Sequence, residues 1–95
     1  MAQYDTNPAV AELAKRLARG RCDLCREPAP FSVGGVPYLE CHYVVHLAKG
    51  GPDTIENAVA LCLNCHRRMH ALDRPADRKR LLSRIETKIL PSAGG

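Results

Sequence analysis

Two Cys-x-x-Cys pairs, Cys22/Cys25 and Cys62/Cys65, constrain the fold of this chain more than any other feature. The spacing within each pair lets two neighbouring thiolates bind one ion, and four thiolates at about 2.3 Å complete a tetrahedral zinc site. Such a closed site has no open position for chemistry, so its role is structural. We therefore expect one structural zinc ion on these four cysteines, with disulfides or free thiols as the alternative.

The segment between the two pairs, residues 26–61, is 36 residues long and exceeds the usual spacing within a zinc finger. We therefore expect a whole substructure to be inserted between them. A redox-active pair is a further alternative, but the chain lacks a thioredoxin-like βαβ pattern. Cys41, the fifth cysteine, is expected to be a small buried residue in a strand.

The length of 95 residues leaves room for one domain, which we take as residues 1–95. A domain this small buries a modest core, and Phe, Tyr and Trp total only four, so a metal staple is expected. No apolar run approaches the roughly 20 residues of a membrane helix, and residues 1–7 do not resemble a signal peptide. We expect a cytoplasmic protein with no membrane partner. In the cytoplasm, cysteines bind metal ions more often than they form disulfides.

The net charge of +4 is unevenly distributed. Residues 1–48 hold five Lys/Arg and five Asp/Glu, whereas residues 49–95 hold nine and five, so the whole excess lies in the second half. A basic half suits a polyanionic partner, although many domains with a pI near 9 bind no nucleic acid.

Helical signals lie at both ends of the chain. Asn7 as N-cap, Pro8 at the first position and Gly20 as a stop predict a helix over residues 8–19. Near the other end, Pro75 and the stop at Pro91 predict a helix over about 75–90. The apolar stripe of this last helix either packs on the core or pairs two copies of the chain into a homodimer. It consists of Leu81, Leu82, Ile85 and Ile89.

The middle of the chain shows mixed signals. Prolines and a Gly pair predict a loop and turn over 28–35. β-Branched and aromatic residues predict a strand over 36–47 that runs into an irregular segment, and residues 58–61 predict a second strand. Asn64 is the expected N-cap of a helix that ends at about Leu72.

Histidines provide the chemistry-bearing pattern. His66 and His70 are four residues apart on the expected helix, so both rings can project from one face. His42 lies in the strand that the cysteine pairs would bring back against that helix. Three neutral imidazoles could hold one divalent ion and leave positions open for water and phosphate. A lone histidine is more often a solvated or core residue, so the argument depends on the three together.

The segments Leu39-Glu-Cys-His-Tyr-Val-Val-His-Leu-Ala-Lys-Gly-Gly-Pro-Asp-Thr-Ile-Glu-Asn57 and Cys62-Leu-Asn-Cys-His66 resemble the HNH endonuclease family, the ββα-metal nucleases, in their zinc-bearing bacterial form. The resemblance covers residues 20–72. It implies an α+β fold, a small His-Me finger domain stapled by the four-cysteine zinc site and flanked by the two terminal helices. It also implies a bacterial or phage-encoded protein.

The resemblance implies roles residue by residue. His42 and His66 match metal ligands of the family, and His70 matches a further ligand found in some members. Asn57 matches the central Asn, whose amide ties the loop between the strands and so orients the general base. The family also implies Mg²⁺ or another divalent ion at this site.

One position departs from the family pattern. The second His of the usual pair, the general base, is here Tyr43, and the usual Pro three residues on is here His46. An unperturbed phenol has a pKa near 10 and an imidazole near 6.5, so tyrosine is a poor base at neutral pH. Three readings remain open: Tyr43 is activated by its surroundings, His46 supplies the imidazole, or the base is lost.

The implied function is metal-dependent hydrolysis of phosphodiester bonds in double-stranded DNA, leaving 5′-phosphate and 3′-hydroxyl ends. The alternative is a zinc-stabilised DNA-binding module with weakened or absent catalysis. No second recognition module is evident, which favours non-specific nicking or targeting by a partner. The candidate phosphate contacts are Lys49, Arg67, Arg68, Arg78, Lys79 and Arg80. For the basic run 78–80, the alternative is that it forms only a solvated helix face.

Overall fold

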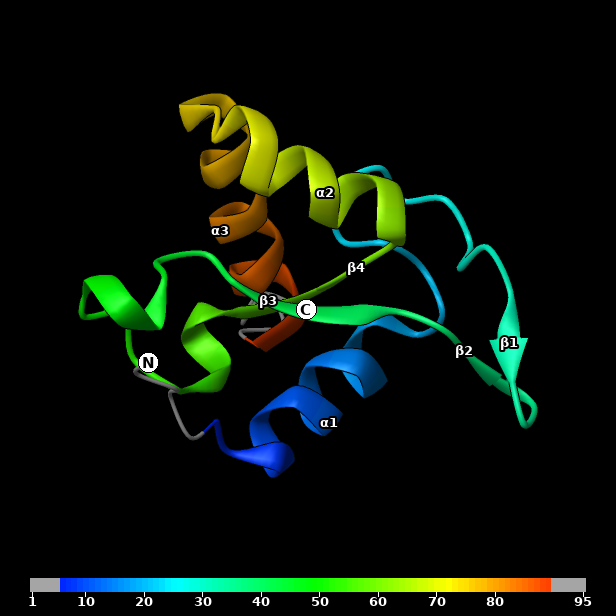
Figure 1. Ribbon diagram of the computed structural model, residues 1–95. Helices are drawn as coiled ribbons and strands as arrows, with labels where there is room; N and C mark the ends of the chain where they lie inside the picture. Colours follow the sequence, from blue (N-terminus) through cyan, green and yellow to red (C-terminus); the bar gives the residue numbers. More distant parts are fainter. Residues whose placement is uncertain (1–5, 90–95) are drawn as a thin grey trace.

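The computed structural model describes residues 6–89 of the chain. At its centre, β3 (Glu40–Tyr43) pairs antiparallel with β4 (Ala58–Leu61), in a register that sets Glu40 opposite Leu61 and Tyr43 opposite Ala58. Helix α1 (Pro8–Ala18) and helix α2 (Leu63–Leu72) pack against these two strands from opposite sides (Figure 1). Helix α3 (Pro75–Ile89) also contacts β4. The expected α+β class with two flanking helices is therefore confirmed.

Helix α1 begins and ends as the sequence predicts. The Asn7 side chain accepts a hydrogen bond from the Ala9 N–H at 2.9 Å, and Pro8 occupies the first turn. The helix ends at Arg19 and Gly20, both with positive φ. Its buried face is formed by Ala14 and Ala18, whose small side chains let the helix lie close to the strands.

The segment before the central strands is more regular than expected. Residues 32–33, predicted to be loop, form strand β1 (Ser32–Val33), which pairs with β2 (Val36–Pro37). The connecting Gly34 and Gly35 have φ of 57° and 81°, the positive values that a two-residue hairpin turn requires. Over residues 36–47, the predicted strand that runs into an irregular segment is present, but it is interrupted and forms β2 and β3. The 3₁₀ helix η1 (Leu47–Lys49) follows the irregular part.

The start of helix α2 differs from the prediction. Cys62, rather than Asn64, is the N-cap, and its sulfur accepts a hydrogen bond from the Cys65 N–H at 3.5 Å. The Cys-x-x-Cys turn and the first helical turn are the same piece of chain, so a thiol takes the place of the usual capping oxygen. The helix ends at Asp73, a left-handed residue.

The core gathers around β4, all of whose residues are buried. Met69 of α2 and Leu81 and Ile85 of α3 pack against it, and Ile89 joins them partly buried. Leu82 was wrongly placed in this stripe: it is 44% exposed, because it follows Leu81 by one residue and so points about 100° away. The predicted last residue of this helix, residue 90, lies outside the described residues. Cys41 is half-buried rather than buried.

A buried carboxylate joins three distant parts of the chain. Asp23, between the first two cysteines, accepts hydrogen bonds through Oδ2 from the Ala60 N–H at 2.8 Å and from the Lys88 ammonium at 2.7 Å. The Lys88 side chain is only 4% exposed. This contact ties the first cysteine pair to β4 and to the end of α3. Within residues 6–89, no helix is long and apolar enough to cross a bilayer.

Candidate metal centres and active site

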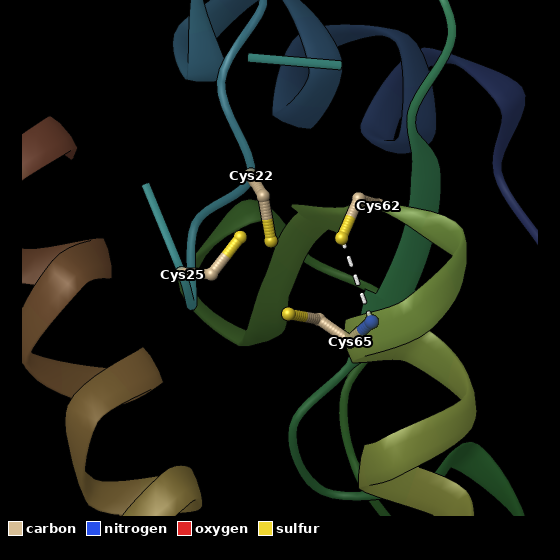
Figure 2. Close-up of side chains that lie close together, drawn as sticks. All are labelled: Cys22, Cys25, Cys62 and Cys65. Carbon is tan, nitrogen blue, oxygen red and sulfur yellow. Dashed lines mark hydrogen bonds between the residues drawn. The ribbon is translucent and has the colours of Figure 1, made fainter. Parts of the chain in front are cut away.

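The four paired cysteines converge on one point (Figure 2). Their sulfur atoms all lie within 4.8 Å of one another, although the two pairs are separated by 36 residues. Four sulfurs about 2.3 Å from one ion would lie about 3.8 Å apart, so the cluster has the size of a tetrahedral zinc site. Burial and the neighbouring Cys22 raise the pKa of the Cys65 thiol, so binding of an ion would displace protons from the cluster.

The backbone around the first pair is shaped for this convergence. The Cys22 N–H donates to the Glu27 carbonyl at 2.9 Å, and the Arg26 N–H donates to the Cys22 carbonyl at 3.0 Å. Arg26 adopts a positive φ of 67° to close the turn. The loop therefore holds Cys22 and Cys25 toward the start of α2, where the second pair lies (Figure 2).

Three histidines form a second cluster between β3 and α2. Nitrogen atoms of His42, His66 and His70 lie within 4.8 Å of one another. His66 Nε2 and His70 Nε2 are 3.2 Å apart. Two donors each about 2.1 Å from one ion, at an angle between 90° and 109°, lie about 3.0–3.4 Å apart, so this separation suits a shared metal ion.

Burial differs across the histidine cluster. His42 is buried, His66 half-buried and His70 exposed, so one side of the cluster opens to solvent. Burial, His66 and His70 lower the pKa of His42 to about 4. At neutral pH the His42 imidazole is therefore uncharged, the form that binds a metal.

Glu40 completes this cluster, and the sequence patterns assigned it no role. Its Oε1 lies 2.8 Å from His66 Nδ1, and its Oε2 accepts a hydrogen bond from the Tyr38 hydroxyl at 2.8 Å. The hydrogen bond with His66 lowers the pKa of Glu40, so the carboxylate is charged. A carboxylate on Nδ1 leaves Nε2 free and directed at the cluster, as in many metal sites. Strand alternation was the available signal, since Glu40 and His42 are two residues apart.

Asn57 clamps the loop that follows β3. Its amide accepts from the Val45 N–H at 2.8 Å and donates to the Val45 carbonyl at 2.9 Å and to the Pro52 carbonyl at 3.0 Å. Gly51 passes so close that a Cβ there would lie 1.9 Å from the Val45 oxygen. The backbone at Val45 is therefore fixed by a buried amide and by a residue that must be glycine.

The two candidate bases lie in different surroundings. The His46 ring is stacked on His70, with centroids 5.4 Å apart, and lies 5.7 Å from His42. The Tyr43 hydroxyl instead donates to Asp53 at 2.5 Å. Burial and this hydrogen bond raise the pKa of Tyr43 above its usual value. The structure thus brings His46, and not the Tyr43 hydroxyl, beside the histidine cluster.

The candidate phosphate contacts are scattered. Arg68 forms two hydrogen bonds of 3.1 Å with Asp77, and Arg78 pairs with Asp73, so these guanidinium groups are partly engaged within the protein. Arg67 and Lys49 are exposed. Lys79 and Arg80 line a cleft beside Asp23 and contribute to a different surface.

Known proteins resemble this chain in sequence and in fold. The family model described as HNH endonuclease matches residues 22–72, more than half of the chain. The type IV methyl-directed restriction enzyme EcoKMcrA of Escherichia coli (strain K12) is 46% identical over 68 residues, which cover 70% of this chain and 24% of that enzyme. The solved structure of the type IV phosphorothioation-dependent restriction endonuclease ScoMcrA is similar with a TM-score of 0.77 and 26% identity. That match covers 93% of this chain and 17% of the other.

The chain therefore belongs to the HNH endonuclease family, as the sequence predicted. It spans about a quarter of the length of the curated relative that it matches.

Proposed function

We propose that this HNH family domain is a metal-dependent DNA endonuclease that hydrolyses phosphodiester bonds. The observation that carries the proposal is the convergence of three imidazoles, with Glu40 on the outer nitrogen of His66, at a site open to solvent. Three neutral ligands leave coordination positions for water and for a phosphate oxygen. The four cysteines, in contrast, hold a structural zinc ion that takes no part in the chemistry.

The ligands of the catalytic ion are His42, His66 and His70. When bound, a divalent ion supplies Lewis-acid stabilisation of the charge on the scissile phosphate and on the leaving oxygen. Imidazoles suit transition metals better than Mg²⁺, which prefers oxygen ligands. We therefore expect Mn²⁺ or Ni²⁺ to support at least as much activity as Mg²⁺ in vitro.

We assign the general base to His46. Strand alternation and the bend after β3 put its ring beside His42 and His70. The Asn57 clamp fixes Val45, the residue before it, and the His46 carbonyl accepts from the Lys49 and Gly51 N–H groups at 2.9 and 3.0 Å. Tyr43 is the less favoured candidate because its hydroxyl already donates to Asp53.

In this scheme His46 takes a proton from a water molecule as the water oxygen attacks phosphorus. The bond between phosphorus and the 3′ oxygen breaks, and that oxygen takes up a proton from solvent. The products are a 5′-phosphate and a 3′-hydroxyl end. We assign contact with a neighbouring phosphate to Arg67, which is exposed and follows His66 directly.

A plasmid-nicking assay with Mg²⁺, Mn²⁺ and Ni²⁺ tests the function. We expect wild-type protein to nick supercoiled DNA and His66→Ala to lose that activity while remaining folded by circular dichroism. Glu12→Gln, at an exposed position of α1, is the matched control and should nick plasmid DNA normally. Retained DNA binding with no cleavage under any metal would instead establish the second candidate, a zinc-stabilised binding module without catalysis.

The proposed role of the chain is the cleavage step, with recognition of the DNA sequence supplied by a partner. The chain spans only 24% of the curated relative and 17% of the solved structure that it matches. Cleavage of both strands by a single-site domain would require two copies or two successive nicks. A homodimer would appear in light scattering as twice the monomer mass, and a monomer that linearises plasmid only after nicking it would argue against dimerisation.

A further inference from the structure

Basic side chains gather at two neighbouring clefts that the endonuclease chemistry does not use. The clefts, each of about 460–470 Å³, share Arg26, Arg84 and Thr87 as a common wall. Their charged lining comes from the end of α1, the loop of the first cysteine pair and one face of α3. We call this surface the basic cleft, with the cations Arg19, Arg21, Arg26, Lys79, Arg80 and Arg84.

The positive charge of the basic cleft is largely uncompensated. Asp23 is the one acidic residue among the described residues that line it, and its Oδ2 is occupied by Lys88 and the Ala60 N–H. The other oxygen, Oδ1, lies 3.7 Å from Arg26 and 3.9 Å from Arg84 Nε, too far for a hydrogen bond. Arg84 Nε is buried and has no hydrogen-bond partner in the protein. Arg19, Lys79 and Arg80 are exposed, so their cationic groups remain available to an anion.

The shape of the charged surface fits a chain of phosphates better than one anion. Arg80 and Arg84 lie one turn apart on α3, a rise of about 6 Å, and Arg19 and Arg21 line the second cleft on the other side of the shared wall. Arginine forks bind phosphate oxygens with two parallel hydrogen bonds. No lining residue of either cleft is aromatic, so base stacking is not offered here and the contact would be to the backbone.

The basic cleft is separate from the histidine cluster. Its residues come from α1, the segment after it and α3, whereas the histidines lie on β3, α2 and the loop after β3. Asp23 and Lys88, which pair beneath the basic cleft, bond to the strand β4 and not to the histidine-bearing helix. A nucleic acid bound in the basic cleft would therefore contact the protein at a distance from the phosphate that is cut.

We propose that the basic cleft binds the sugar–phosphate backbone of DNA as a second, sequence-independent contact. The identity of the ligand as DNA rests on the proposed function, whereas the binding itself requires no catalysis. Each phosphate neutralised would release condensed counterions and make binding more dependent on salt. The contact would hold the domain on DNA without reading its sequence.

The test is the salt dependence of binding in the zinc-loaded His66→Ala chain without added divalent metal, so that no DNA is cut. Fluorescence anisotropy follows a labelled duplex of about 30 base pairs between about 50 and 200 mM salt. The test variant adds Arg21→Gln and Arg80→Gln, one exposed arginine from each part of the basic cleft. The matched control adds Lys15→Gln and Arg16→Gln, exposed cations of α1 that line a different cleft with Glu12.

We expect the test variant to bind on the order of tenfold more weakly near 0.1 M salt and to lose up to about 1.8 from the slope of log K against log salt. The control should change neither quantity. An unchanged slope in the test variant, or an equal loss in both variants, would overturn the proposal.

The outcomes separate this proposal from the endonuclease assignment. If wild-type protein fails to nick plasmid but the two arginines still control the salt slope, the binding surface stands and the catalytic assignment falls. If wild-type protein nicks plasmid but the two arginine substitutions leave the salt slope unchanged, the catalytic assignment stands and the binding surface falls. Melting curves of both double variants check that each is folded.

Discussion

The cysteine cluster and the histidine cluster share helix α2, since Cys65 and His66 are consecutive residues, yet they differ in what each connects. The cysteines join the loop after α1 to the start of α2, two segments that are far apart in the chain. The histidines join β3 to α2, which already contact each other. Four thiols close one site, whereas three imidazoles leave the other open.

From this difference in ligand number and connectivity, we expect the two clusters to have different roles. In the proposed scheme, the four-ligand site between distant segments would stabilise the fold, and the three-ligand site between packed elements would serve chemistry. Both clusters use helix α2, so the cysteine cluster would also position His66 and His70. Variants that affect one cluster but not the other test this division.

The largest effect is expected from loss of the zinc ion that we propose for the cysteine cluster. Chelation of zinc, or Cys65→Ser, should unfold the domain, because structural zinc contributes apparent binding energies of about 10–16 kcal/mol, comparable with or larger than the whole stability of a small domain. Far-UV circular dichroism and zinc content measured together check this. His70→Ala, the control at the exposed end of the histidine cluster, should leave the melting transition nearly unchanged. A chelated protein that keeps its cooperative melt would contradict the comparison.

The next effect concerns the base. His46→Ala should lower kcat for plasmid nicking by about 10²–10⁴-fold, the usual contribution of a general base, without changing the fold. Tyr43→Phe removes only the hydrogen bond to Asp53 and should retain most activity. The reverse pattern, with Tyr43→Phe inactive and His46→Ala active, would assign the base to the phenol. Single-turnover nicking rates of wild type and the two variants, measured at saturating metal, test this prediction.

A smaller effect is expected from the clamp between the clusters. Asn57→Ala leaves the Val45 N–H and two carbonyl groups without their partners and should cost about 1–3 kcal/mol of stability. Because Val45 precedes His46, kcat should fall more than metal affinity does. Urea melts and metal titrations of the same preparation separate the two quantities. A variant that loses metal binding and keeps kcat at saturating metal would show that Asn57 supports the ligands instead.

The smallest effect is expected from the carboxylate behind the ligand. Glu40→Gln should weaken metal binding at the histidine cluster by about 10–100-fold, because the amide holds the His66 ring less firmly and makes it a poorer donor. Zinc content of the cysteine cluster should stay at one ion per chain. Isothermal titration with Mn²⁺ measures the change. Equal Mn²⁺ affinities for wild type and variant would show that Glu40 does not contribute to metal binding.

The sequence predicted the parts of the fold that carry a local signal. Asn7 and Pro8 start α1 as expected, and the cysteine spacing and the order of the motif identify the family correctly. The histidines expected to share a site do lie together, although their roles remain predictions. These successes depend on residue types whose spacing along the chain already encodes their geometry.

Other features leave no signal in the spacing of residue types and could not be predicted. The hairpin of β1 and β2 has two residues in each strand, too few to show alternation. Arg68 was expected to be available for phosphate but is held by Asp77, which lies in the next helix. Cys62 replaced Asn64 as the cap because the metal-binding turn and the helix start coincide.

The contact between Asp23 and Lys88 makes the fold sensitive to loss of the last turn of α3. The four paired cysteines precede Lys88 by more than twenty residues, so a chain truncated before residue 88 keeps every thiol of the cysteine cluster. It loses the ammonium partner of the buried Asp23 carboxylate, and breaking a buried ion pair by removing one partner costs about 3–5 kcal/mol. Such a truncated chain would therefore bind zinc yet fold poorly.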